Sequence, residues 1–453
     1  MKHLPFLVSL FLFSFKIHAQ CWKSADAGTN HSAALTNSGR ILTWGYNAYG
    51  QLGDGTLTNK NTLTPIGYDS SWSAISCGGN HTIALKNDGS MWAWGRNVQG
   101  ELGIGNNQNK NVPTQVGQNY DWTKIYASGF GAIAQKTNGT LWAWGYNFFG
   151  QLGDSSNVGK NAPVQIGNDT TWRFISAGNV HTMAIKSDGS MWSWGSNSFG
   201  QLGDSSYAAK NTPQQVGTSF NWKSVAAGGN HTLAVRSDGT LWTCGKNNKG
   251  QLGDSTNVAI NTLHQIGIDT NWLSVAAGFE HSFGIKADSS LWAWGEGGYG
   301  QLGVGNGFDK WRPTRVGTLN DWAEGNVGEN HNMFLKTDST LWAWGENTYG
   351  QLSFNSGGNT PQKINCLISL SLLENEKNQQ FKIYPSPTVD WVNIDLPQSM
   401  QNQVLCIYQI DGQLIKEIQY TGQPLSVKAL DPGLYYINLK NSEKDLHLRF
   451  VKL

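Results

Sequence analysis

A tryptophan that returns every 50 residues limits the fold of this chain more than any other feature. Two further tryptophan registers accompany it, with Leu42 and Cys244 standing where two expected tryptophans are missing. Seven copies span about residues 21 to 366, so the chain is expected to stack seven similar units. The three registers are Trp22, Trp72, Trp122, Trp172, Trp222, Trp272 and Trp322; then Trp92, Trp142, Trp192, Trp242, Trp292 and Trp342; then Trp44, Trp94, Trp144, Trp194, Trp294 and Trp344.

Each copy is expected to form four short β-strands. In the fifth copy, "NWKSVAAG" and "HTLAVR" alternate in polarity, and the glycine turn "SDGT" leads into the hairpin partner "LWTCG". The segment "TLHQIG" supplies a fourth strand, and its sister copies carry a proline that suits the edge of a sheet. We therefore predict an all-β fold, a seven-bladed β-propeller of 50-residue repeats. The edge prolines are Pro113, Pro163, Pro213 and Pro313.

The tryptophans are expected to pack between the blades. Along "LWAWG" the period of two places both tryptophans on one face of the strand and the leucine and alanine on the other. Neighbouring blades must bury their broad faces against each other, and large flat side chains suit that gap. The aromatic density therefore favours blade packing over a ligand cage.

The two ends of the repeat region are expected to meet. We expect one blade to combine strands from both termini in a clasp that closes the ring, with Cys21 and Cys366 in one loop. A disulfide between these two cysteines is our hypothesis. Cys77, Cys244 and Cys406 lie in apolar surroundings and are expected to be buried thiols.

The first 20 residues have the organisation of a secretory signal peptide, with a basic start, an apolar run and Ala19 before the expected cleavage point. Cys21 follows directly and raises the alternative of lipidation, although Gln20 is not the small residue that lipoprotein signals place there. No later segment has the roughly 20 apolar residues that a membrane-spanning helix needs. The net charge of +1 gives no general attraction for nucleic acid. We therefore expect an exported chain without nucleic-acid partners, a monomer by default.

The recurring segment "HTMAIKSDGSMWSWGSNSFGQLGD" resembles the regulator of chromosome condensation repeat, a family of seven-bladed propellers. The resemblance covers about three quarters of the chain, since His, Asp-Gly, Trp-Gly and Gly-Gln-Leu-Gly recur at fixed offsets. Gly131 replaces the histidine of the third copy, and Glu101 and Ser353 depart from Gly-Gln-Leu-Gly. Ser289 and Ser339 replace the turn glycine, so those two turns are expected to be looser.

The last 75 or so residues alternate as the strands of a small β-sandwich and resemble the C-terminal sorting domain of the type IX secretion system of Bacteroidetes. We expect residues 367–380 to be a linker and residues 381–453 to form this domain. The resemblance implies passage across the outer membrane by the type IX secretion machinery, so the protein is expected to be secreted or displayed on the cell surface. The residues that carry the resemblance are Tyr384, Pro385, Pro387, Thr388, Asp390, Gly412, Gly433, Tyr435 and Lys452, while Ser386 stands where asparagine is usual.

No motif points to catalysis or to a cofactor. Six histidines share one register, one per blade, which is too far apart for a shared metal. We interpret them as structural groups whose rings bond backbone at the start of a strand. An aspartate recurs in "LGDGT" and "LGDSS", where a turn-capping carboxylate is a better explanation than a cation loop. No nucleophile elbow, P-loop or zinc spacing occurs. These recurring residues are His31, His81, His181, His231, His281 and His331, and Asp54, Asp154, Asp204 and Asp254.

Positions that vary between the copies are where a partner can be recognised, because the invariant positions serve the blade. The variable residues after Trp-Gly are rich in tyrosine, phenylalanine and basic residues, and tyrosine and arginine are residue types that make interface hot spots. A second aromatic and basic cluster occurs in "GFDKWRPTR" of the sixth copy. The candidate partner-binding residues are Tyr46, Tyr49, Arg96, Tyr146, Phe148, Phe149, Phe199, Lys246, Tyr299 and Tyr349, with Phe308, Trp311 and Arg312 from the second cluster.

We favour a secreted or surface-displayed propeller that binds a protein or a glycan through one face of the ring. Guanine-nucleotide exchange, the activity for which the repeat family is named, is an alternative that export argues against. Light sensing by tryptophans is disfavoured because the position two residues before the repeat histidine is never tryptophan. An extracellular enzyme with an unrecognised site is the remaining alternative.

Overall fold

The computed structural model describes residues 21–67, 69–354, 356–365, 382–384, 388–395, 404–409, 414–421, 423–439 and 448–452. The chain divides into two compact units, with the boundary after Asn365. The expected signal peptide, the expected linker and Cys366 lie outside the described residues. No helix in the described residues is long and apolar enough to cross a membrane.

Each of the seven repeats forms one four-stranded antiparallel sheet, a blade, whose strands lie side by side in chain order. The blades contain β1 (Trp22–Ala27), β2 (His31–Thr36), β3 (Ile41–Gly45) and β4 (Lys60–Pro65); β5 (Trp72–Cys77), β6 (His81–Lys86), β7 (Met91–Gly95) and β8 (Lys110–Gln115); β9 (Trp122–Ala127), β10 (Gly131–Lys136), β11 (Leu141–Gly145) and β12 (Lys160–Ile166); β13 (Trp172–Ala177), β14 (His181–Lys186), β15 (Met191–Gly195) and β16 (Lys210–Gln215); β17 (Trp222–Ala227), β18 (His231–Arg236), β19 (Leu241–Gly245) and β20 (Ile260–Ile266); β21 (Trp272–Ala277), β22 (His281–Lys286), β23 (Leu291–Gly295) and β24 (Lys310–Arg315); β25 (Trp322–Val327), β26 (His331–Lys336), β27 (Leu341–Gly345) and β28 (Gly358–Ile364).

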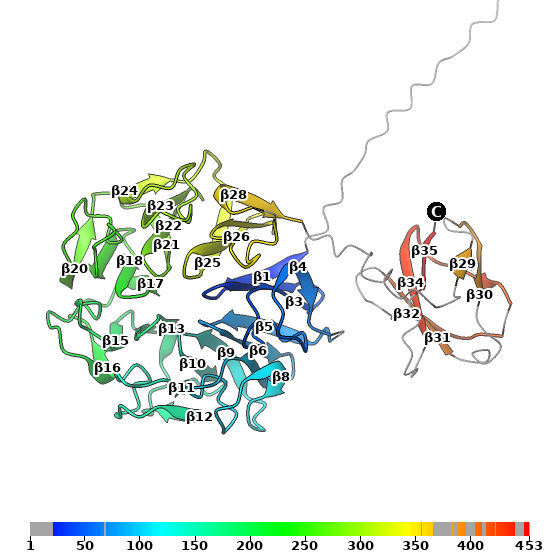
Figure 1. Cartoon of the computed structure of the whole chain (residues 1–453), viewed down its shortest axis with the longest axis horizontal. Coiled ribbons are helices and arrows are strands. Elements are labelled where there is room, and N and C mark those ends of the chain that lie inside the picture. The colour runs from blue at the N-terminus through cyan, green and yellow to red at the C-terminus, as the bar shows by residue number, and fades with distance from the viewer. Residues whose placement is uncertain are drawn as a thin grey trace, which may run out of the picture. The chain divides into compact units, whose positions relative to one another are not determined.

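The seven blades close into a ring, which confirms the predicted propeller (Figure 1). The first strand of each blade lies near the centre of the ring, and fourth strands such as β12, β16 and β20 lie at its rim. The repeat prolines of the fourth strands are therefore at a sheet edge, where a missing N–H removes no ladder bond.

The expected strand clasp is wrong. The fourth strand of each repeat pairs with the third strand of the same repeat, as Leu42 opposite Pro65 shows, so strands from the two chain ends never share a sheet. The first and seventh blades instead meet through side chains, and the Asn326 Nδ2 donates to the Ala25 carbonyl at 2.8 Å. The ring is closed by an interface of the same kind as those between consecutive blades.

Tryptophans of each blade pack against aliphatic side chains of the preceding blade, as predicted. Between the second and third blades, Met91 and Ala93 belong to the same buried cluster as Trp122 and Trp144. The Trp144 indole also donates to the Glu101 carbonyl of the preceding blade at 2.8 Å. Contact area and a directed hydrogen bond thus hold the two blades in one register.

A cation lies between two tryptophans at the hairpin end of six blades, an arrangement not predicted from the sequence. Lys86 Nζ lies 4.9 Å from the Trp72 ring centroid and 4.2 Å from that of Trp92. It also lies 2.7 Å from an Asp69 carboxylate oxygen, and the Trp92 indole donates to the Ser90 hydroxyl at 2.9 Å. The half-buried tryptophans are thereby fixed by cation–π attraction and by hydrogen bonding. The equivalent cations are Lys136, Lys186, Arg236, Lys286 and Lys336.

The turns with serine in place of glycine are not looser. Ser289 and Ser339 have φ values of 62° and 59°, in the same left-handed region as Gly89 at 80°. The Ser289 N–H donates to the Lys286 carbonyl at 2.9 Å, the same bond that closes the glycine turns. The surrounding hairpin imposes the conformation, so serine adopts it at a steric cost.

The C-terminal unit is a small β-sandwich, as predicted. One sheet contains β29 (Lys382–Tyr384), β30 (Trp391–Asp395) and β33 (Leu425–Ser426). The other contains β32 (Leu414–Gln419), β31 (Val404–Gln409), β34 (Gly433–Leu439) and β35 (Leu448–Lys452). Val392 and Ile394 from the first sheet share a buried core with Leu405, Ile437 and Phe450 from the second.

The sorting-motif residues in the described part of this unit hold its strands together. Thr388 is buried, donates to the Trp391 carbonyl at 2.6 Å and forms a parallel bridge with Lys452. The Asp390 carbonyl accepts the Val427 N–H at 2.8 Å. Gly433 pairs with Lys452, and the Tyr435 hydroxyl donates to the Asp431 carbonyl at 2.9 Å. Pro385, Pro387 and Gly412 lie outside the described residues.

Candidate functional site

Two loops of every repeat meet on one face of the ring, which we call the loop face. One is the turn between the first and second strands, and the other is the long connection between the third and fourth strands. They are tied together because the first residue after Trp-Gly donates its N–H to the turn, as Tyr46 does to Asn30 at 2.8 Å and Tyr146 does to Phe130 at 2.9 Å. Residues that vary in both loops are thus presented side by side.

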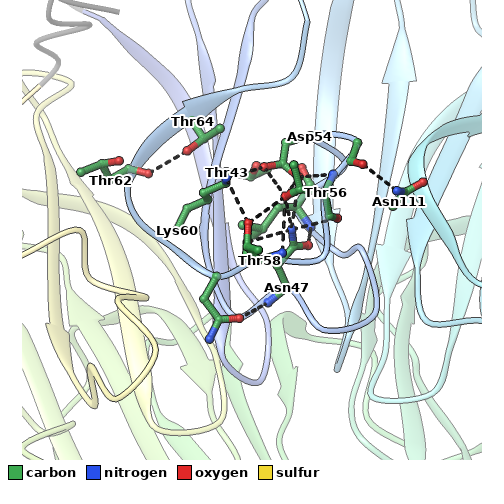
Figure 2. A network of polar contacts seen from close by, with 12 residues as sticks. Thr43, Asn47, Asp54, Thr56, Thr58, Lys60, Thr62, Thr64 and Asn111 are labelled. Atoms are coloured by element: carbon green, nitrogen blue, oxygen red, sulfur yellow. Dashed lines mark hydrogen bonds and ion pairs between the residues drawn. The ribbon is translucent and has the colours of Figure 1, made fainter. Parts of the chain in front are cut away.

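A buried asparagine organises the long loop. In the first repeat the Asn47 Nδ2 donates to Asp54 at 3.1 Å, and the Asn47 Oδ1 accepts the Leu52 N–H at 3.0 Å (Figure 2). The Asp54 carboxylate accepts the N–H and the hydroxyl of Thr56 at 3.0 and 2.8 Å, and Lys60 Nζ lies 3.4 Å away. Burial alone would raise the pKa of Asp54, but the bonds from Thr56 and the Lys60 charge lower it. This confirms the turn-capping role expected for the repeat aspartates.

The described residues contain no group of three or more His, Cys, Asp or Glu side chains placed to hold a metal ion. The carboxylate oxygens of the loop aspartates accept hydrogen bonds from residues of their own turn. They position the variable residues of the loop and leave little coordination capacity.

The repeat histidines connect consecutive blades. The His231 Nε2 donates to the Ser282 hydroxyl at 2.9 Å, and that hydroxyl donates to the Gln251 carbonyl at 2.8 Å. Because a carbonyl can only accept, the hydroxyl proton is committed to Gln251 and the imidazole must be the donor. The Trp294 indole donates to the same carbonyl at 2.9 Å. The histidines are therefore structural, as predicted, although most bond a side chain of the next blade rather than backbone.

Burial keeps these imidazoles neutral. It lowers the pKa to about 3 for His31, His181, His231 and His331, and to about 4 for His81 and His281. In each ring the Nδ1 is buried without a hydrogen-bond partner. At neutral pH all six rings are therefore uncharged, and their unpaired nitrogens are shielded from solvent.

Aromatic side chains gather on the loop face of the third blade. The rings of Tyr146, Phe148 and Phe149 lie within 6.4 Å of one another, and Phe130 lies 6.0 Å from Tyr146. We call these four residues the phenylalanine cluster. Phe148 is 66% exposed and Phe130 is 37% exposed. Tyr146 and Phe149 are half-buried, so Phe148 supplies most of the exposed apolar area of the cluster.

A second aromatic group lies where the seventh blade meets the first. The Tyr46 ring centroid lies 4.8 Å from that of Tyr349, with the two rings tilted at 55°, and 6.2 Å from that of Tyr49. Partial burial, reinforced by the two neighbouring phenols, raises the pKa of Tyr46. The structure thus brings together three of the candidate tyrosines, whereas Tyr299 is exposed without an aromatic neighbour among the described contacts.

The candidate basic residues on the loop face are paired with carboxylates. Arg96 is bonded to Glu101 and lies 5.8 Å from the Phe130 ring. Lys246 is bonded to Glu280 and lies 5.6 Å from the Phe199 ring. Local neutralisation gives the face no strong attraction for polyanions.

The cluster of the sixth repeat is divided between the rim and the long loop. Trp311 and Arg312 belong to β24 at the rim, where the Trp311 carbonyl accepts the Ser255 N–H of the preceding blade at 2.9 Å and Arg312 is bonded to the Ser255 hydroxyl. Phe308 is strongly exposed in the loop before β24. Trp311 therefore has a structural contact in addition to its exposed surface.

A pocket of about 370 Å³ lies between the second and third blades at the loop face. Its polar side chains are already bonded, since Asn161 donates to Asn107 at 3.2 Å, Asn107 donates to the Val98 carbonyl at 2.9 Å and Lys160 pairs with Asp154 at 3.3 Å. Gln99 is exposed at its edge. The pocket offers few free polar groups to a ligand.

Phe130 was not among the residues singled out from the sequence. The signal was available, because the position before the repeat histidine is asparagine in four copies and phenylalanine in the third. Glu329 was also missed. Burial, together with the carboxylates of Glu346 and Glu296, raises its pKa, so the loop face carries a half-buried acidic group near the seventh blade.

Comparisons with solved structures show the same fold. Human WBSCR16 is 19% identical, with a TM-score of 0.64, over 70% of this chain and 88% of that one. Prp20p from Saccharomyces cerevisiae, described with its binding to Gsp1p and histones, is 24% identical, with a TM-score of 0.62, over 70% of this chain and 83% of that one. The yeast RCC1 (Prp20) bound to Kap60 is 18% identical, with a TM-score of 0.64, over 81% and 87%. No curated protein sequence is significantly similar to the chain.

Family comparisons cover nearly the whole described chain. The secretion system C-terminal sorting domain matches residues 382–452, so the chain is a substrate for type IX secretion to the cell surface or the extracellular space. The RCC1-like domain matches residues 9–267 and 168–383, in two overlapping stretches. With its seven blades and its recurrent Trp-Gly and Gly-Gln-Leu-Gly positions, the chain belongs to the family of RCC1-like domains.

Proposed function

We propose that the protein is an extracellular binding module that acts by recognition rather than by catalysis. The observation that carries this proposal is the phenylalanine cluster, four aromatic side chains on adjoining loops, of which Phe148 and Phe130 are exposed and Tyr146 and Phe149 are half-buried. Aromatic side chains, phenylalanine included, are enriched at protein–protein interfaces. The blade beneath supplies the rigidity, so little ordering entropy is lost on binding.

The partner is proposed to be a protein rather than a glycan. Phenylalanine has no polar group for sugar hydroxyls, and the polar side chains of the nearby pocket are already bonded. A protein surface with apolar side chains would cover Phe148 and displace water from it. The tyrosines at the closing interface give the same face a second, more polar contact.

The test compares binding of partners to the isolated propeller in three forms. The wild type, a Tyr146→Ala plus Phe148→Ala plus Phe149→Ala variant and a Phe220→Ala control are immobilised and exposed to medium and surface extract from the native environment. Phe220 is 58% exposed and lies in the connection before β17, at the opposite end of the blades. We expect captured proteins to fall at least tenfold with the triple variant and to stay unchanged with the control.

Equal capture by all three forms would contradict a role for the cluster. A glycan array probed with the same three forms separates the ligand classes. If the triple variant loses binding on the glycan array but captures proteins as well as the wild type does, the ligand of the cluster is a glycan and not a protein.

A further inference from the structure

The interface between the third and fourth blades, the third interface, lacks contacts that recur elsewhere in the ring. Gly131 stands where the bridging histidine would be, so no imidazole reaches the fourth blade. The Thr182 hydroxyl lies 3.3 Å from the Gln151 carbonyl, against 2.8 Å for Thr232 and the Gln201 carbonyl at the next interface. The histidine bridge is thus absent and the remaining bond is long.

Two buried donors at this interface have no hydrogen-bond partner. The Trp194 indole N–H is unpaired, whereas Trp294 and Trp344 reach the equivalent carbonyl at 2.9 Å. The Gln151 Nε2 is also unpaired. Its counterpart Gln201 lies 3.3 Å from the Asn230 Oδ1, but valine replaces that asparagine in the fourth blade. Buried donors without acceptors weaken the closed arrangement relative to an open, hydrated one.

Packing is incomplete at the same place. A cavity of about 10 Å³ lies between the blades, with Ser128 and Ala132 on one side and His181 and Thr182 on the other. Small voids forfeit dispersion contacts. Thr182, which lines this cavity, is at the position that the bridging histidine bonds in other repeats, so the void and the missing bridge have one origin in Gly131. The unpaired donors coincide with them at the end of the interface near the loop face.

The remainder of the third interface is well connected. At the hairpin end, the Gln135 Nε2 donates to the Trp172 carbonyl at 3.0 Å. At the rim, the Ser155 N–H donates to the Asn211 carbonyl at 2.9 Å. These bonds can act as a hinge, since they lie away from the void.

We propose that the ring opens at the third interface, by separation of the third and fourth blades near the loop face around the hinge formed at the hairpin end and the rim. Phe130 is adjacent to Gly131, so the phenylalanine cluster lies at the opening. Opening would change the spacing between this cluster and the fourth blade. The inference stands whether or not the cluster binds a partner.

Amide hydrogen exchange measured by mass spectrometry tests the inference, and the repeats serve as internal standards. Peptides covering β10 and β14 are compared with the equivalent second strands of the other blades in the full chain. The ladder bonds of β10 and β14 lie within their own blades and break more readily once the neighbouring blade no longer packs on them. We therefore expect exchange at least severalfold faster on the two sides of the third interface. Uniform protection around the ring would overturn the proposal.

A reciprocal pair of variants links the opening to the missing contacts. Val180→Asn supplies the acceptor that Gln151 lacks, and Asn230→Val removes the acceptor that Gln201 has. We expect Val180→Asn to slow exchange severalfold at the third interface alone and Asn230→Val to accelerate it at the fourth interface alone. If either variant leaves its interface unchanged while the fold is retained by circular dichroism, the unpaired amide is not the cause and the proposal fails.

Discussion

The imidazole Nε2 of His331 lies 2.9 Å from the hydroxyl of Ser32, a residue 299 positions earlier in the chain. The same hydroxyl donates to the Gln351 carbonyl at 2.8 Å, as does the Trp44 indole. This relationship joins the first blade to the seventh. It has the same form as the bridge from His231 to Ser282, which joins two blades that are consecutive in the sequence.

Replacement of Ser32 by alanine tests whether the closing interface contributes as much to stability as the other interfaces do. Ser32→Ala leaves the His331 donor buried without an acceptor, so we expect the free energy of unfolding to fall by about 1–3 kcal/mol. Urea unfolding followed by tryptophan fluorescence measures the change. Ser282→Ala is the matched control and should cost a similar amount. A much smaller effect of Ser32→Ala would mean that the closing interface is already frayed.

The disulfide of Cys21 should stabilise the closed ring. Cys21 is disulfide-bonded in the structure, whereas Cys77, Cys244 and Cys406 are free. Its expected partner, Cys366, lies outside the described residues, so the pairing stays a prediction. We expect Cys21→Ser to lower the free energy of unfolding by up to about 5 kcal/mol on the loop-entropy estimate.

Reduction of the wild type should reproduce the effect of Cys21→Ser and have no further effect on that variant. Peptide mapping without reduction identifies the partner. A Cys21 peptide linked to any cysteine other than Cys366 would disprove the predicted pair.

Acid should destabilise the propeller at a pH well above that of ordinary carboxylate titration. The six buried imidazoles have pKa values of about 3 to 4 when folded, against about 6.5 when unfolded. The unfolded chain therefore binds more protons below pH 6.5, and the free energy of unfolding falls as the pH drops toward 4. Asp26 acts in the opposite sense because burial raises its pKa to about 6, but it is one group against six.

Urea unfolding at pH 7.5, 6.0 and 5.0 measures this dependence, which should approach about 1.4 kcal/mol per pH unit for each imidazole. His231→Gln places an amide donor near the position of Nε2, toward Ser282, without a titrating ring. Between pH 6 and 5 the free energy of unfolding of the variant should therefore fall by about 1.4 kcal/mol less than that of the wild type, which corresponds to one proton fewer taken up on unfolding. An unchanged slope would show that His231 is not neutral in the folded protein.

Glycine at the two serine turns should stabilise the protein. Ser289 and Ser339 hold φ near +60°, where a side chain is disfavoured. Ser289→Gly is expected to raise the free energy of unfolding by up to about 1 kcal/mol, since relief of strain exceeds the added entropy of the unfolded chain. Ser187→Gly is a suitable control, because Ser187 is exposed in the equivalent turn and does not have a positive φ. Destabilisation by Ser289→Gly would mean that interactions of the Ser289 side chain outweigh the steric cost of its positive φ.

Much of the architecture could be predicted because the repeat fixes it redundantly. Seven copies of one pattern together constrain the strand positions, the edge prolines and the tryptophan packing. A chance pattern in one copy does not change the prediction, because the other six copies do not share it. The capping role of Asp54 was predictable from turn chemistry within a few residues. The strand clasp was predicted wrongly, because a 50-residue repeat does not itself show at which strand a blade begins. The pairing of Leu42 with Pro65 shows that the first blade ends with the fourth strand of its own repeat.

The candidate site was predictable only in part. Variation between copies pointed to Tyr146, Phe148 and Phe149, which do lie together. It could not show that Arg96 is neutralised by Glu101 or that Phe130 from a different loop completes the cluster. Such neighbourhoods depend on how the two loops of a repeat fold back on each other, and sequence spacing does not encode that distance.

Blades built from contiguous repeats also bear on how such a chain can change in evolution. A duplication or loss of one 50-residue unit adds or removes a complete sheet with its own edge strand, and leaves no half-sheet to be repaired. A clasped ring would not tolerate this, because its two terminal pieces must match each other. The gene segment for one repeat is thus a self-sufficient unit of copying, in which a duplicated loop can diverge without disturbing its neighbours.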